Sequence, residues 1–168
     1  MKTLRRLREL TDPESLRLFG WSLLTIFLAA TLLRTRRLPA LLCYLTRVAH
    51  AHTTSQKARL EPDFRSLDRV RQYSHVIITH LLRSRRPCLL RSLVLYRYCW
   101  KHGVPVSIHF GVRSDMDGLK GHSWVTLDGT PLGESEEGLR PYAAVYSYPA
   151  GTDGADPQQA LVAVGWQP

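Results

Sequence analysis

The spacing of apolar residues changes once along this chain, near residue 103, and this change constrains the fold more than any other feature. Before it, apolar side chains recur every three or four residues, which is the period of an α-helix. After it, they alternate with polar or small residues, which is the period of a half-buried strand. Helices followed by strands predict an α+β fold rather than an alternating α/β fold.

Four helical segments are predicted in the first part of the chain. The first begins at the capping sequence of residues 11–14 and ends at the arginines and proline of residues 34–39. The next two cover residues 41–48 and 64–82, with a polar connection between them. The last runs from Pro87, which suits the first helical position, to Gly103, a typical helix stop.

The first predicted helix contains an apolar run, residues 18–33, with no charged residue between Arg17 and Arg34. As a helix this run is about 24 Å long at ~1.5 Å per residue, which is short of the ~30 Å hydrocarbon core of a bilayer. Acidic residues precede it, which is not typical of a signal peptide. We therefore expect a helix that is buried or docked on a partner, and association with a membrane is the less favoured alternative.

Strands are predicted over residues 104–113, 121–127 and 143–148, with one more near residues 161–164. Asp128-Gly129 is a signal for a two-residue hairpin turn, so residues 132–135 are expected to return antiparallel to residues 121–127. In that register Leu127 pairs with Thr130, and His122 lies diagonal to Glu134. The hairpin therefore predicts that an imidazole and a carboxylate are neighbours.

The charge divides at nearly the same place as the apolar period. Residues 1–101 carry 20 Lys and Arg against 6 Asp and Glu, a balance of +14, whereas residues 102–168 carry 3 against 8, a balance of −5. The arginines are dispersed, without interleaved aromatic residues or a recognition helix. We therefore expect no nucleic-acid partner, although a non-enzymatic basic module that binds nucleic acid remains an alternative. An acidic protein or peptide partner suits the basic part better.

The cysteines point to a reducing compartment and to one reactive thiol. Three cysteines are too few and odd in number for a disulfide scaffold, which favours a cytoplasmic protein. Cys88 stands at the start of a predicted helix, where unpaired N–H groups and the helix dipole favour an anion, and Arg85 and Arg86 precede it. These features favour the thiolate, which is the nucleophilic form. Cys99, about 16 Å further along the same helix, is expected to be a packing residue.

His122 is the predicted base for such a nucleophile. It begins a strand after a loop that contains glycine, so it can face a cleft, and Glu134 is the carboxylate that can orient its ring. Asp128 lies about 20 Å along the strand from His122 and is predicted to be a turn residue. Trp124 is expected either to pack in the core or to line a substrate groove.

Two other groups are given structural interpretations. His109 falls on the polar face of its predicted strand and is expected at the surface. Cys43, His50 and His52 do not match a standard metal spacing and lack a fourth ligand, so no metal site is predicted.

The segments Pro87-Cys88, Gly121-His122-Ser123-Trp124-Val125 and residues 128–134, taken in order, resemble the lasso-peptide leader peptidases. These are small transglutaminase-like cysteine proteases of lasso-peptide biosynthesis, and the resemblance spans residues 85–148. It implies a transglutaminase-like, papain-like core over residues 86–168, in which a helix with an N-terminal cysteine packs on an antiparallel sheet. A basic helical region, residues 1–85, precedes that core.

The resemblance also implies the roles of the site residues. Cys88 is the nucleophile, His122 is the general base and acid, and Glu134 is the acidic member, at a position where the family usually has aspartate. Ser123 stands where the family commonly has alanine. No metal or organic cofactor is implied.

The activity implied is removal of the leader from a ribosomally made precursor peptide through a thioacyl-enzyme. Because the residues before Cys88 are predicted to be helical rather than rich in strands, the resemblance implies a stand-alone enzyme with a separate leader-recognition protein of the RRE type. An ATP-dependent lasso cyclase then acts on the freed core peptide. A transglutaminase-like acyltransferase, which passes the acyl group to an amine, is the alternative with the same fold.

Overall fold

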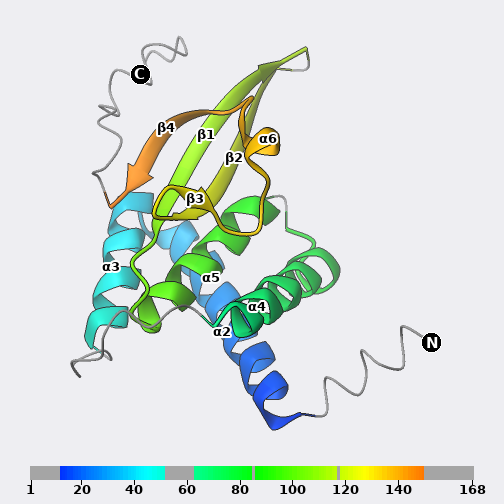
Figure 1. Ribbon diagram of the computed structural model, residues 1–168, viewed down its shortest axis with the longest axis vertical. Helices are drawn as coiled ribbons and strands as arrows, with labels where there is room; N and C mark the ends of the chain where they lie inside the picture. Colours follow the sequence, from blue (N-terminus) through cyan, green and yellow to red (C-terminus); the bar gives the residue numbers. More distant parts are fainter. Residues whose placement is uncertain (1–11, 52–62, 85, 117, 150–168) are drawn as a thin grey trace. The chain divides into compact units, whose positions relative to one another are not determined.

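The computed structural model describes residues 12–51, 63–84, 86–116 and 118–149 (Figure 1). The chain divides into two compact units, Met1–Val104 and Pro105–Pro168. The described part of the first unit is helical, and that of the second contains an antiparallel sheet, which confirms the α+β fold and the helical N-terminal region. The predicted boundary between residues 85 and 86, which assigns the cysteine-bearing helix to the second part, stays a prediction.

The predicted helices are all present in the first unit. They are α2 (Pro13–Thr35), α3 (Leu38–Ala51), α4 (Phe64–Val76) with the π-helical turn η1 (Ile77–Leu81), and α5 (Pro87–Lys101). Pro87 occupies the first turn of α5, where its missing N–H costs no helical hydrogen bond. Gly103 follows the helix with a φ of +74°, a conformation that glycine adopts without strain.

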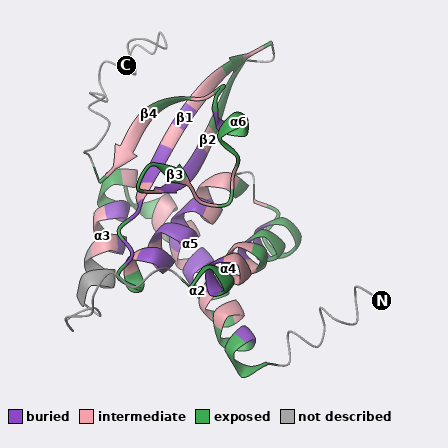
Figure 2. Cartoon of the chain, viewed as in Figure 1, coloured by how far each residue is buried: buried purple, intermediate pink, exposed green. Residues whose placement is uncertain are grey.

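Helix α2 is longer than its apolar run. It has 23 residues and runs from Pro13 to Thr35, which confirms the start predicted at residues 11–14 and the end predicted at residues 34–39. Among the described residues it is the one helix long and apolar enough to cross a membrane, a test that the core helix of a soluble protein also passes. Figure 2 shows that α2 is only partly buried. Leu16, Leu24 and Phe27 are among its exposed residues.

The core of the helical unit is built around α5. Its buried residues include Leu93, Val94 and Tyr96, each with no exposed surface. The Tyr96 hydroxyl lies 2.8 Å from Thr46 Oγ1 on α3. Since the Thr46 hydroxyl donates to the Leu42 carbonyl at 2.9 Å, Tyr96 is the donor in this pair. This hydrogen bond therefore joins α3 to α5 inside the core.

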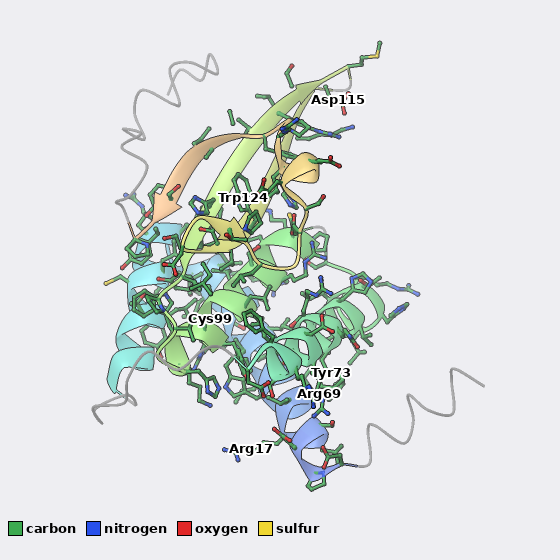
Figure 3. The ribbon with its side chains drawn as sticks, in the orientation of Figure 1. Arg17, Arg69, Tyr73, Cys99, Asp115 and Trp124 are labelled. Atoms are coloured by element: carbon green, nitrogen blue, oxygen red, sulfur yellow. The ribbon has the colours of Figure 1, made fainter. Side chains whose placement is uncertain are left out.

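Helices α2 and α4 are joined by aromatic and charged contacts, along which Figure 3 labels Arg69 and Tyr73. The ring of Tyr73 meets that of Phe19 edge-on, with centroids 5.7 Å apart. Arg69 lies 3.8 Å from Asp12 and 3.9 Å from Glu14. Because these ion pairs are solvent-exposed, the aromatic contact contributes more to the packing.

The sheet of the second unit has four antiparallel strands in the order β3-β2-β1-β4. They are β1 (Ser107–Asp115), β2 (Gly118–Leu127), β3 (Thr130–Pro131) and β4 (Ala143–Tyr148), with the short helix α6 (Glu136–Leu139) before β4. The β1–β2 register places His109 opposite Trp124 and Gly111 opposite His122. The side chains of His109, Trp124 and His122 therefore share one face of the sheet, on which Gly111 leaves an open position.

The hairpin after β2 forms its turn as predicted, but its return strand is short. Asp128 and Gly129 have φ angles of +48° and +82°, and Leu127 pairs with Thr130. The return strand expected over residues 132–135 is shorter than predicted: β3 ends at Pro131, and only the Leu132 N–H beyond it still donates to β2, to the Val125 carbonyl at 2.8 Å. The chain bends away at Gly133, which has a φ of +78°, and the Ser135 side chain then accepts a hydrogen bond from the Gly138 N–H at the start of α6. The strand predicted near residues 161–164 lies outside the described residues.

Replacing Tyr96 with phenylalanine tests the contact between α3 and α5. The substitution keeps the packed ring but leaves Thr46 Oγ1 without its donor, so we expect a loss of about 1 kcal/mol in the free energy of unfolding. Urea denaturation measures it as a lower midpoint with an unchanged slope. The control is Tyr44→Phe on the exposed side of α3, which we expect to leave the midpoint in place. Equal midpoints for the two variants would contradict the inference.

Candidate active site

His122 and Glu134 form a short hydrogen bond in the second unit. The Nε2 atom of His122, on β2, lies 2.6 Å from Oε2 of Glu134, in the loop between β3 and α6. Both side chains are partly buried, with 18% and 23% of their surface exposed. A carboxylate only accepts hydrogen bonds, so Nε2 carries the proton of the neutral imidazole. The lone pair is then on Nδ1, which makes Nδ1 the basic atom of the site.

The loop that carries Glu134 is shaped by its two neighbours. Gly133 adopts the left-handed conformation, in which a side chain would be strained. Ser135 is the N-cap of α6. The chain therefore leaves the sheet at Gly133 and enters a helix at Ser135, with Glu134 held between these two fixed points.

Two aromatic rings bound the imidazole of His122. The Trp124 ring is nearly parallel to it, with centroids 6.1 Å apart and an angle of 17° between planes. The Tyr142 ring, from the segment between α6 and β4, lies 5.0 Å away at 37°. Trp124 is 9% exposed, and Figure 3 shows it on the sheet. Trp124 is therefore packed beside His122. A contact of Trp124 with substrate stays a prediction.

Gly111 makes room for the Trp124 ring. A Cβ atom at position 111 would lie 2.7 Å from Cζ3 and 2.8 Å from Cη2 of Trp124, and 3.0 Å from the carbonyl oxygen of Ala143. Real Cβ atoms do not approach other atoms so closely. Glycine at this position, which is opposite His122 in the ladder, therefore allows the indole to lie across β1.

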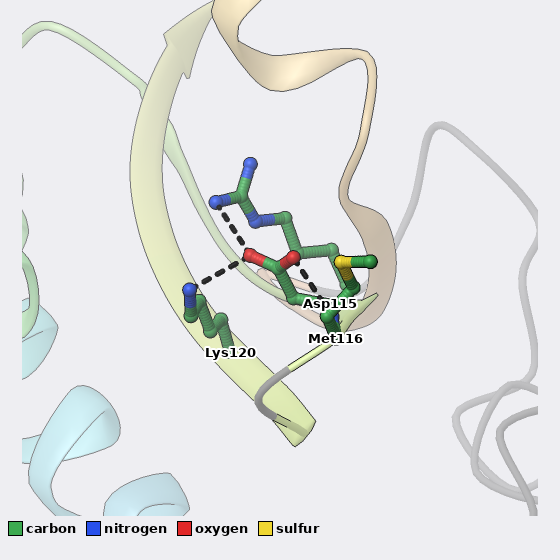
Figure 4. A network of polar contacts seen from close by, with 4 residues as sticks. Asp115, Met116 and Lys120 are labelled. Carbon is green, nitrogen blue, oxygen red and sulfur yellow. Dashed lines mark hydrogen bonds and ion pairs between the residues drawn. The ribbon is translucent and has the colours of Figure 1, made fainter.

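An ion-pair network fixes the strand ends beyond the site, as Figure 4 shows. Asp115 accepts hydrogen bonds from Lys120 Nζ at 2.7 Å, the Met116 N–H at 2.9 Å and Arg113 Nη2 at 3.3 Å. The hydrogen bond from Lys120, more than the other contacts, holds the pKa of the Asp115 carboxyl below its usual range. The Arg113 guanidinium in turn lies 5.2 Å from the centre of the Tyr142 ring, so the network reaches the ring that contacts His122.

His109 is not at the surface, contrary to the expectation from the sequence. It is 8% exposed. Its Nδ1 and Nε2 atoms each lie 2.8 Å from a hydroxyl oxygen, Ser147 Oγ on β4 and Thr126 Oγ1 on β2. A polar side chain on a central strand can be buried because hydroxyl groups on both neighbouring strands satisfy it. The prediction of a surface histidine is therefore wrong.

Cys88 is placed in the first turn of α5, in the first unit. It is a free, half-buried thiol. The first intrahelical hydrogen bond of α5 runs from the Leu90 N–H to the Arg86 carbonyl at 3.4 Å. The N–H groups of Cys88 and Leu89 therefore have no acceptor within the helix and are available to an anion. Arg86 is exposed beside them, and Arg85 lies outside the described residues.

The other cysteines differ from Cys88. Cys99, labelled in Figure 3, is 1% exposed, and burial raises the pKa of its thiol to about 12. Cys43 is half-buried on α3. Within the described residues no three His, Cys, Asp or Glu side chains gather as metal ligands, and His52 lies outside them.

The structure thus brings two of the three predicted catalytic residues together. His122 and Glu134 are hydrogen-bonded in the second unit, and Asp128 lies in the hairpin turn, away from that pair. Cys88 belongs to the first unit. The catalytic roles of all three stay predictions.

Alkylation distinguishes the two cysteines of α5. Because burial disfavours the charged form, Cys99 with a pKa of about 12 is about 10⁻⁴ ionised at pH 8 and should not react with iodoacetamide in the folded protein. We expect Cys88 to be alkylated first, as read by peptide mass mapping. Guanidinium chloride should make Cys99 reactive, as a control. Alkylation of Cys99 ahead of Cys88 under native conditions would contradict the assignment.

A family model described as the transglutaminase-like superfamily matches residues 28–147. The match covers 120 of the 168 residues and contains Cys88, His122 and Glu134. No curated protein and no solved structure matches the chain.

Proposed function

We propose, since the chain belongs to the transglutaminase-like superfamily, that it is a cysteine peptidase that removes the leader from a lasso-peptide precursor. The superfamily includes both cysteine peptidases and acyltransferases. The observation that carries the proposal is the 2.6 Å hydrogen bond between His122 and Glu134, which leaves Nδ1 of the imidazole as the base for a thiol. The choice of a lasso-peptide leader as substrate rests on the resemblance of residues 85–148 to the leader peptidases.

In the first step the Cys88 thiol transfers its proton to Nδ1 of His122. The thiolate then attacks the carbonyl carbon of the peptide bond between leader and core. Glu134 stabilises the imidazolium that forms, through its hydrogen bond to Nε2. The step requires Sγ of Cys88 and Nδ1 of His122 to come within hydrogen-bond distance.

The charge that develops on the carbonyl oxygen needs a hydrogen-bond donor. The N–H of Cys88 meets this need, because it lies in the first turn of α5 and has no acceptor within the helix. The positive end of the helix dipole adds to the effect.

In the second half of the reaction His122 gives its proton to the leaving amine, and hydrolysis of the thioester restores the Cys88 thiol. The Nδ1–H of His122 protonates the amine of the core peptide as the C–N bond breaks, which leaves the leader as a thioester on Cys88. Nδ1 then takes a proton from water, the hydroxide adds to the thioester carbonyl, and the C–S bond breaks. The leader leaves as a carboxylic acid and Cys88 is regenerated, so the reaction consumes one water and needs no further reactant.

The proposal includes partners. A separate RRE-type protein presents the leader of the precursor peptide, and an ATP-dependent cyclase uses the freed amine of the core. The enzyme requires no metal or organic cofactor, and it works in the reducing cytoplasm, where Cys88 remains a thiol. Nucleic acid has no part in the reaction.

Cleavage of a precursor tests the activity directly. The protein is incubated with a lasso-peptide precursor and the leader-recognition protein, and the products are weighed by mass spectrometry. We expect two peptides, with no cleavage by Cys88→Ala or His122→Ala. Cys99→Ala is the matched control on the same helix and should cleave, since Cys99 is a buried packing residue. Normal cleavage by Cys88→Ala would overturn the proposal.

Glu134→Gln tests the acidic member of the site. A glutamine amide donates a hydrogen bond to Nε2 and so favours the wrong tautomer, in which Nδ1 is protonated. We expect kcat to fall by about 100-fold or more. Asp128→Asn is the control, since this residue forms the hairpin turn, where asparagine also tolerates the positive φ. If Asp128→Asn were the slower enzyme, Glu134 would not be the orienting acid.

Acyl transfer is the second candidate, because the superfamily match admits it. The same thioester would then be attacked by an amine rather than water. Adding a small primary amine to the reaction distinguishes the two outcomes by mass, since transfer gives a conjugate of the leader with that amine. Hydrolysis gives the leader with a free carboxylate.

A further inference from the structure

Three rings share one face of the sheet in the second unit. His109 and Trp124 occupy opposed positions on β1 and β2, and their rings stack with centroids 5.5 Å apart and 19° between planes. His122, two residues along β2 on the same face, is also nearly parallel to the indole, at 6.1 Å and 17°. The two imidazoles are therefore connected through Trp124.

His109 is held more firmly than a packing residue needs. Its two ring nitrogens each lie 2.8 Å from a hydroxyl, Thr126 on β2 and Ser147 on β4. These contacts span three adjacent strands, so they fix both the position and the plane of the ring. The proposed reaction uses no proton from His109. The His109 side chain is buried, with 8% of its surface exposed.

The indole of Trp124 is confined by Gly111 and by the ring of His109. One edge of its indole lies across Gly111, where no Cβ would fit. The face of the indole meets the fixed imidazole of His109. A ring restrained in this way offers His122 a flat surface of fixed orientation.

We propose that His109 is a positioning residue for the proposed reaction, on which this inference rests for its kinetic consequence. His109 sets the plane of Trp124, and Trp124 sets the plane of His122, so that Nε2 faces Glu134 and Nδ1 remains available to the nucleophile. Tyr142 and Glu134 bound the same imidazole from other directions. His109 acts only through Trp124 and does not touch the reacting atoms.

Imidazole ¹⁵N spectra of the full-length protein test this without a substrate. The chain has seven histidines, and loss of a signal in His122→Gln assigns that residue. We expect wild-type His122, when neutral, to hold the proton on Nε2 alone. His109→Leu introduces an apolar side chain of similar size that cannot form a hydrogen bond with either hydroxyl. In this variant His122 should show a mixture of both tautomers. His75→Leu, on the exposed side of α4, is the matched control and should leave the His122 signals unchanged.

A second variant guards against loss of folding in His109→Leu. Ser147→Ala removes one of the two hydroxyls that hold His109, and it should shift the His122 tautomer in the same direction by a smaller amount. Unchanged His122 signals in folded His109→Leu, or in Ser147→Ala if the first variant does not fold, would overturn the proposal.

The kinetic test measures kcat and KM separately for cleavage of the precursor. Misorientation of the base should lower kcat of His109→Leu about tenfold and leave KM within about twofold of wild type. His109→Gln, whose amide can bond one hydroxyl, should recover part of that loss. Unchanged kcat in folded His109→Leu would count against positioning. If wild type cleaves no precursor, the proposed function fails, but the tautomer of His122 still decides whether His109 positions it.

Discussion

The hydrogen bond between His122 Nε2 and Glu134 is the interaction on which the rest of the site depends. It decides which nitrogen holds the proton and which one is basic, and so, in the proposed reaction, which atom of the imidazole would accept the proton of a thiol. The neighbouring segments position the two side chains that make this contact. The bend at Gly133 and the cap at Ser135 place the carboxylate, whereas β2 places the imidazole in the ladder opposite Gly111.

Much of this arrangement could be predicted from the sequence because local rules govern it. The helix start at Pro87 and the stop at Gly103 follow from backbone chemistry, and both were found where predicted. The Asp128-Gly129 turn sets the pairing of Leu127 with Thr130, which brings residue 134 back toward β2. The contact between His122 and Glu134 was therefore predictable from turn arithmetic, even though the strand beyond Pro131 does not form.

The remaining features depend on contacts between distant segments, and no local pattern reports them. His109 was expected at the surface because it falls on the polar face of its predicted strand, and only the folded sheet brings the hydroxyls of Thr126 and Ser147 to its two nitrogens. The need for glycine at position 111 becomes visible only when the Trp124 ring lies across it. Sequence periodicity predicts on which face of a helix or strand a residue lies, but it does not show which other segments pack against that face.

The central claim is that Cys88, in the first unit, and His122, in the second, act as one nucleophile and base. The pH dependence of Cys88 alkylation by iodoacetamide, compared between wild type and His122→Gln, tests it most directly because no substrate is needed. If the imidazolium sustains the thiolate, the wild-type rate should change little between about pH 8 and pH 6. In His122→Gln the rate should fall steeply over that range, because no imidazolium is left to hold the thiolate as the pH drops. Superimposable profiles for the two proteins would contradict the claim.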